Sequence, residues 1–209
     1  TKEAPCLYVL ENRPGTTLDL NFYVLGLKDG LSAEEAEEDP DLQQAIDWMR
    51  RLYGKIGVEL GELRYFELSP ELEDEYKRIR SREEAYRLTA QGKPPTRTLP
   101  GHLSVDVFLV KDLQVGQSDQ GDVLGLSAGI PGAAGLHGHA RNGLIFQTVD
   151  LGSSNKHVGL IMAHEIGHFL GLRHTTEIVH DTSRADELDD RLGTTDPIED
   201  TAVCSNIFE

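Results

Sequence analysis

The sequence predicts an α+β fold. Residues 18–24 and 103–109 largely alternate between apolar and polar side chains, as β-strands do. Residues 41–56 place apolar side chains at helical spacing. The 209 residues, 38% of them hydrophobic, suffice for one sizeable core. We therefore expect a single domain over residues 1–209, with helices lying across a sheet.

A strand, a helix and a second strand are expected first. The apolar and polar residues alternate from Leu18 to Val24, which is typical of a strand with one buried face. The helix starts at Asp41, and Gly57 marks its end. Residues 58–68 predict the second strand, with an interruption at Gly61.

Charged helical segments are expected next. Ser69 is followed by proline, which indicates an N-cap with proline in the first turn. Ser81 begins a capping-box sequence, and Gly92 with the prolines behind it ends that helix. We interpret the charges of residues 71–87 as solvated faces and not as a binding surface.

The second half begins with the clearest strand, residues 103–109. Residues 121–143 are rich in glycine, which permits loops, bulges or close backbone approach, and they contain no phosphate-binding pattern. Residues 144–149 predict another strand. A helix follows from about His157, with candidate caps in residues 153–155, and its largely apolar surface predicts burial.

The stretch from His164 to His174 has the spacing of a metal site. On a helix, His164 and His168 project from one face and can approach one ion, with Glu165 beside them. Gly171 can leave helical geometry and turn the chain so that His174 returns as a third ligand.

Three neutral histidines are good ligands for Zn2+ and leave a fourth position open for water, as in a catalytic site. Glu165 is then placed to act as general base and acid. The alternative is a buried helix whose histidines only satisfy core hydrogen bonds, but so many defined positions seldom coincide by chance.

These residues match HExxHxxGxxH, and the chain here resembles the metzincin clan of zinc endopeptidases. Residues 171–176 and 196–201 look most like pappalysin-type and related bacterial secreted peptidases. The resemblance implies a twisted mixed sheet with an active-site helix and a backing helix. It also implies an N-terminal subdomain (1–171), a small irregular C-terminal subdomain (172–209), and an edge strand within residues 123–130 that pairs with substrate, where an ordinary surface loop is the alternative.

One metzincin feature is missing. Members of the clan carry a methionine in a turn after the third histidine, whereas Met49 and Met162 both precede it here. Either Phe208 stands in that place or the turn lies beyond residue 209. Only 35 residues follow His174, which is short for a complete lower subdomain. Acidic residues between 181 and 200 could bind Ca2+, but a solvated acidic loop is the simpler interpretation.

Charge and cysteines suggest the setting. The formal net charge of −16 argues against nucleic acid and anionic membranes as partners and suits a secreted protein. No apolar run is long enough to span a bilayer, and the N-terminal residues have no signal-peptide core, so we expect a mature extracellular chain. Cys6 and Cys204 could form a disulfide, or Cys6 could occupy the open zinc position of a latent form.

The first hypothesis is therefore a zinc endopeptidase that cleaves extended polypeptide, with no nucleic acid or membrane-inserted partner. Two alternatives stay open. One is a non-catalytic zinc-binding module for adhesion or recognition, and the other is a zinc hydrolase acting on a small amide. The pair His137 and His139 could bind a metal adventitiously, but we interpret it as a surface loop.

Overall fold

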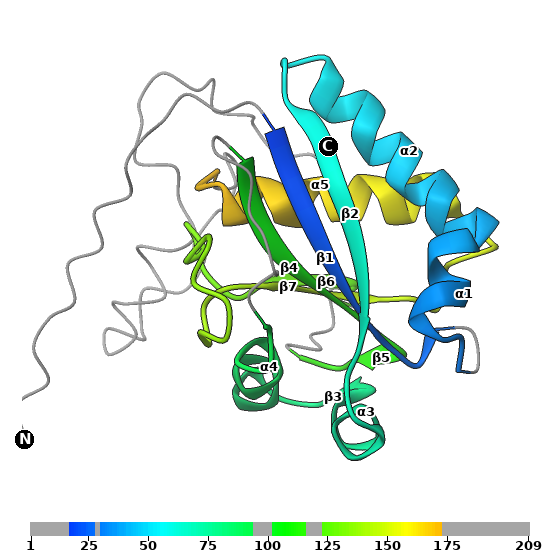
Figure 1. Ribbon diagram of the computed structural model, residues 1–209, viewed down its shortest axis with the longest axis vertical. Helices are drawn as coiled ribbons and strands as arrows, with labels where there is room; N and C mark the ends of the chain where they lie inside the picture. Colours follow the sequence, from blue (N-terminus) through cyan, green and yellow to red (C-terminus); the bar gives the residue numbers. More distant parts are fainter. Residues whose placement is uncertain (1–16, 28–29, 94–101, 116–122, 173–209) are drawn as a thin grey trace, which may run out of the picture.

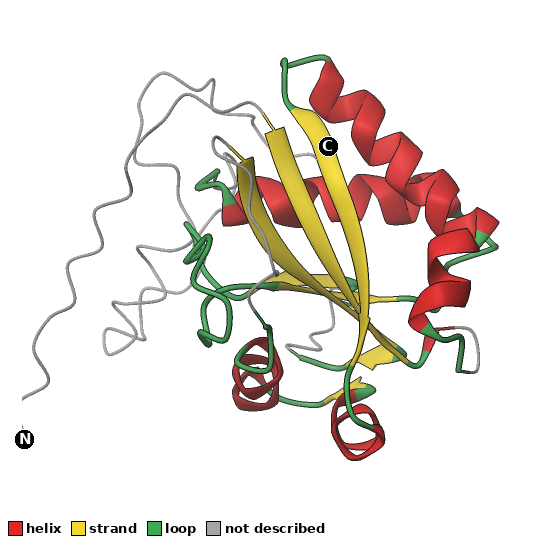
Figure 2. Ribbon diagram, in the orientation of Figure 1, coloured by secondary structure: helices red, strands yellow, loops and turns green. Residues whose placement is uncertain are grey.

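The computed structural model describes residues 17–27, 30–93, 102–115 and 123–172, which build a five-stranded sheet flanked by helices (Figure 1). The strand order is β2-β1-β4-β7-β6. The first four run parallel and β6 runs antiparallel to β7 (Figure 2). The strands are β1 (Thr17–Leu25), β2 (Glu59–Glu67), β4 (His102–Val110), β6 (Gly125–Ser127) and β7 (Leu144–Gln147). The predicted α+β fold with a mixed sheet is confirmed.

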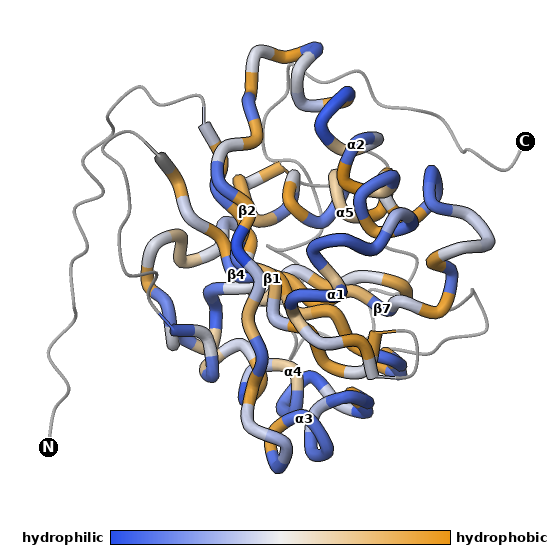
Figure 3. Tube along the Cα trace, turned by 45° about the vertical axis from the view of Figure 1, so that its right-hand side comes forward, coloured by the Kyte–Doolittle hydropathy of each residue, from blue (hydrophilic) through white to orange (hydrophobic). Residues whose placement is uncertain are grey.

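Three helices cover one face of the sheet. They are α1 (Ala33–Glu38), α2 (Pro40–Gly54) and α5 (Asn155–Phe169). α2 and α5 bury one side each against alternate residues of the central strands. Figure 3 shows the middle of the sheet as mostly hydrophobic and α2 as alternating patches, as an amphipathic helix requires. The predicted helix across the sheet is confirmed, and Gly57, with a φ of 78°, lies just after its end.

The other face carries a second apolar cluster that the sequence did not predict. α3 (Pro70–Tyr76) and α4 (Arg82–Thr89) pack their few apolar side chains against β1 and β4. A two-stranded parallel sheet of β3 (Arg78–Ile79) and β5 (Asp112–Leu113) lies beside them. Ser69 and Ser81 cap α3 and α4 as predicted, and most charged residues of these helices face solvent.

The prediction of a half-buried first strand is wrong. Every residue of β1 after Thr17 is buried, including Asp19 and Asn21, because helices or loops cover both faces of this central strand. The predicted interruption at Gly61 is confirmed as a register shift, since Leu18 pairs with Leu60 but Leu20 pairs with Leu63. The Asp19 carboxylate accepts a hydrogen bond from the Glu62 N–H at 2.9 Å, which satisfies the backbone of this bulge.

The start and the burial of α5 also differ from expectation. Ser154 is the N-cap by position but makes no side-chain cap hydrogen bond. Instead the Asn155 amide donates to Asp41 and Gln44 of α2, at 2.8 Å each, and fastens the start of α5 to the other helix. Leu160 in α5 and Leu170 just after its end remain 37% and 41% exposed, so the described part of the chain leaves one side of α5 open. No described helix is long and apolar enough to cross a membrane.

The crossing of α2 and α5 depends on Gly159. A Cβ atom at this position would lie 2.3 Å from the Ala45 carbonyl oxygen, which is backbone and has little room to yield. We expect Gly159→Ala to lower the free energy of unfolding by about 1–3 kcal/mol, as overpacking does, in spite of alanine's higher helix propensity. Denaturant unfolding would measure this loss. An unchanged or raised midpoint would contradict so close a contact.

Candidate metal centre

The open side of α5 presents a cluster that could hold a metal ion. The ligand atoms of His164, Glu165 and His168 all lie within 4.8 Å of one another. The two imidazole rings are four residues apart on the helix, with centroids 4.5 Å apart and planes at 82°. His164 is exposed, Glu165 is half-buried and His168 is buried. The predicted convergence of these three side chains therefore exists in the structure.

The end of α5 determines which nitrogen of His168 can bind a metal. The Nδ1 atom of His168 lies 2.8 Å from the Leu172 carbonyl oxygen, which can only accept a hydrogen bond. Nδ1 must therefore carry the proton, and in the neutral ring the lone pair is on Nε2. A backbone carbonyl that fixes the tautomer in this way is one of the common supports of a histidine ligand.

Gly171 makes this support possible. Its φ of 105° lies outside the helical region, as predicted. The Gly171 N–H donates to His168 O and the Leu172 N–H donates to Gly167 O, each at 2.9 Å, which is the Schellman arrangement of a helix end. The turn thus brings the Leu172 carbonyl back over the helix and onto the His168 ring.

The helix α2 packs behind the part of α5 that carries this cluster. The Tyr53 hydroxyl of α2 donates to the Ala163 carbonyl at 2.8 Å, one residue before His164. Burial raises the pKa of Tyr53, so the hydroxyl remains a donor throughout the physiological pH range. This bond joins α2 to the part of α5 that carries the cluster.

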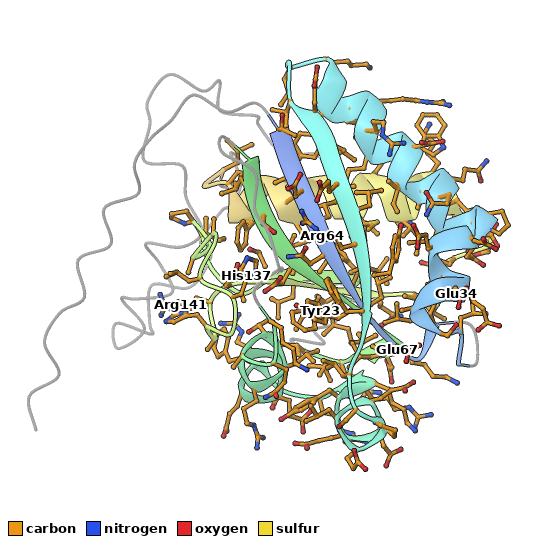
Figure 4. All side chains as sticks on the ribbon, viewed as in Figure 1. Tyr23, Glu34, Arg64, Glu67, His137 and Arg141 are labelled. Atoms are coloured by element: carbon orange, nitrogen blue, oxygen red, sulfur yellow. The ribbon has the colours of Figure 1, made fainter. Side chains whose placement is uncertain are left out.

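A buried polar network lies on the sheet face opposite α5, and sequence reasoning missed it. The Asp106 carboxylate, fully buried in β4, accepts from the Asn21 amide at 2.9 Å and lies 2.8 and 2.9 Å from His137 Nδ1. The Arg64 guanidinium donates to Asn21 Oδ1 at 3.2 Å. Figure 4 shows Tyr23, Arg64 and His137 around this part of the sheet. The network satisfies polar groups that would be costly to bury alone.

The interpretation of His137 and His139 as a surface loop is wrong for His137. The His137 side chain is only 5% exposed, because it points into the protein and contacts the buried Asp106 carboxylate. The side chain of His139 is exposed. Burial raises the pKa of Tyr23, and the nearby Asp106 raises it further. The polar residues at alternate positions of residues 18–24 and 103–109 were the signal of this network. Alternation alone, however, cannot distinguish a strand face exposed to solvent from a buried face whose polar groups are hydrogen-bonded to one another.

The loop that contains His137 also contacts the end of α5. The Gly132 N–H donates to the Phe169 carbonyl at 2.8 Å, and a Cβ on Gly132 would lie 2.0 Å from the Phe169 ring. The same loop therefore contacts both the sheet carboxylate and the last turn of α5.

Several predicted residues lie outside the part of the chain that the structure describes. They include the expected third ligand His174, Cys6, Cys204, Phe208 and the acidic residues between 181 and 200. The third-ligand, disulfide, latency and calcium predictions, and the assignment of subdomains 1–171 and 172–209, thus remain predictions.

Comparison with known protein families identifies a relationship. A family model described as peptidase M43, pregnancy-associated plasma protein-A, matches residues 103–207, which is just over half of the chain. The matched segment runs from β4 through the edge strand and all of α5. No curated protein matches the chain.

Proposed function

The chain belongs to the peptidase M43 family and is a metallopeptidase of the metzincin type, and on this premise we propose that it is a zinc-dependent endopeptidase. It would hydrolyse internal bonds of extended polypeptide. The observation that carries the proposal is the close approach of His164, Glu165 and His168 on the open side of α5. A histidine-rich site of this kind suits zinc better than magnesium or calcium, which prefer oxygen ligands.

The residues would divide the work as follows. His164 and His168 would hold the ion from one helix face, and His174, three residues after Gly171 in the sequence, would supply the third nitrogen. Zinc, when bound, lowers the pKa of a coordinated water and polarises the substrate carbonyl. Glu165 accepts the proton of the attacking water and passes it to the leaving amine. The Leu172 carbonyl keeps His168 in the tautomer that this arrangement requires.

The sheet edge next to the cluster is where we propose that substrate binds. β6 is the last strand of the sheet, and no described strand pairs with its outer side. Leu124 O accepts from Gln147 N–H and Ala128 N–H donates to Gly143 O, at 2.9 and 3.0 Å. In an antiparallel pair such groups alternate, so the backbone of Gly125 and of Ser127 is directed to the outer edge. A peptide could add there as another strand.

Hydrolysis of denatured casein and of an unstructured peptide library by zinc-loaded protein tests the proposal. We expect cleavage at internal peptide bonds. A chelator should stop it by removing the ion, and added zinc should restore it by binding to the metal-free protein. Zinc binding without cleavage would favour the non-catalytic module. Cleavage of small amides alone would favour the small-amide hydrolase.

We also propose that the protein acts outside the cell. The support is its strongly acidic composition and its two cysteines near opposite ends of the sequence, which an oxidising compartment would allow to pair. The mass of the intact protein with and without reductant tests this pairing, because reduction of a Cys6–Cys204 disulfide to two thiols adds two hydrogen atoms to the protein.

A further inference from the structure

The edge strand and the proposed base are in direct contact. Gly125 is buried at the start of β6, opposite Phe146 of β7. A Cβ atom at Gly125 would lie 2.7 Å from Glu165 Cγ, 3.0 Å from Ile161 Cγ2 and 3.1 Å from Phe146 Cδ1. The first distance is shorter than any ordinary contact between carbon atoms. The stem of Glu165 therefore occupies the space that a side chain at position 125 would fill.

We propose that Gly125 is a positioning residue that sets the place of the Glu165 carboxylate, an inference that rests on the proposed function. The requirement is not one of backbone conformation, because Gly125 is not among the glycines with positive φ. It is a requirement for space. Any L-side chain at this position would meet Glu165 before it met anything else.

The three neighbours differ in their freedom to move. Phe146 is 1% exposed and belongs to the main apolar core, so its ring has little room. Ile161 lies on α5, one turn before Glu165, and packs against the same core. Glu165 is half-buried and has a flexible stem. An added methyl group would therefore rotate Glu165 away and displace its carboxylate from the metal site.

The same residue also belongs to the strand at which we propose that substrate binds. The backbone groups of Gly125 are directed to the outer edge of β6, where an extended peptide would pair. Gly125 therefore fixes the separation between the bound peptide and the base that serves it. The place of the Glu165 carboxylate and the place of the bound peptide both depend on this one position. Substitution of Gly125 should therefore slow the chemical step more than it weakens the binding of zinc or peptide.

Gly125→Ala, compared with Gly54→Ala, tests this inference. Gly54 is an exposed glycine at the end of α2, and a Cβ there would meet no atom within 4 Å. We expect Gly125→Ala to bind zinc normally and to lose about 10- to 100-fold in kcat, with a much smaller change in KM, as a displacement of about 1 Å can cause. Gly54→Ala should keep the wild-type kcat. A wild-type kcat in Gly125→Ala, or a loss no larger than its loss of bound zinc, would overturn the inference.

A stability comparison tests the contact without reference to catalysis. In a Glu165→Ala background the Cγ atom is gone, so Gly125→Ala should lower Tm less than it does in the wild-type background, by about 2 °C or more. Folding of Gly125→Ala only in the Glu165→Ala background would support the same contact. Equal losses of Tm, or failure to fold in both backgrounds, would refute it. If zinc-loaded wild-type protein cleaves no peptide, the proposed function fails, and the Tm comparison still decides whether Gly125 positions Glu165.

Discussion

Replacement of Glu165 with alanine is expected to lower kcat by about two to four orders of magnitude while zinc remains bound. General acid–base catalysis contributes an effect of this size, and the variant would lose the carboxylate that the described part of the chain places in the histidine cluster. The ion itself should stay, because the proposed ligands are the three histidines. Peptide hydrolysis and metal content, measured on the same preparation, would check both halves of the prediction.

Two further variants separate this effect from a general loss of charge. Glu165→Gln keeps the shape of the side chain but cannot accept the proton, so it should be almost as inactive as Glu165→Ala. Glu83→Ala removes an exposed carboxylate from α4 and should keep the wild-type kcat. Wild-type turnover in Glu165→Gln would mean that another group accepts the proton.

The helices and long strands could be predicted because their patterns are local. α2 follows from apolar residues at helical spacing, and β4 from alternation along its length. The short pair of β3 and β5 could not be predicted, because two-residue strands carry no periodic signal. The burial of Asp19 and Asn21 also could not be predicted from the alternation of apolar and polar residues along this strand. Their partner Arg64 and the neighbouring Asp106 come from other strands and meet them only in the folded sheet.

The site divides in the same way. His164, Glu165, His168 and the turn at Gly171 could be predicted from a spacing of a few residues, since one helix and its end place all of them. The contact of Gly125 with Glu165 joins positions 40 residues apart, and nothing in a glycine-rich segment marks which glycine the packing requires. Tyr53 and the Leu172 carbonyl support the site through single hydrogen bonds that no sequence pattern indicates.

Replacement of His168 with alanine is expected to abolish both zinc binding and hydrolysis. Loss of an outer partner of a ligand weakens metal binding by about 10- to 100-fold, so loss of a ligand itself should exceed about 100-fold. Zinc should raise the Tm of the wild-type protein, because an ion that binds only the folded state stabilises it. In His168→Ala this rise should disappear, and calorimetry with and without zinc would measure it.

His157→Ala is the matched control, because His157 is an exposed histidine in the first part of the same helix. It should keep both the zinc-dependent rise in Tm and the activity. Glu165→Ala should keep the rise and lose the activity, whereas His168→Ala should lose both. A zinc-dependent rise that survives in His168→Ala would place the metal elsewhere, and the assignment of α5 as the catalytic helix would then be wrong.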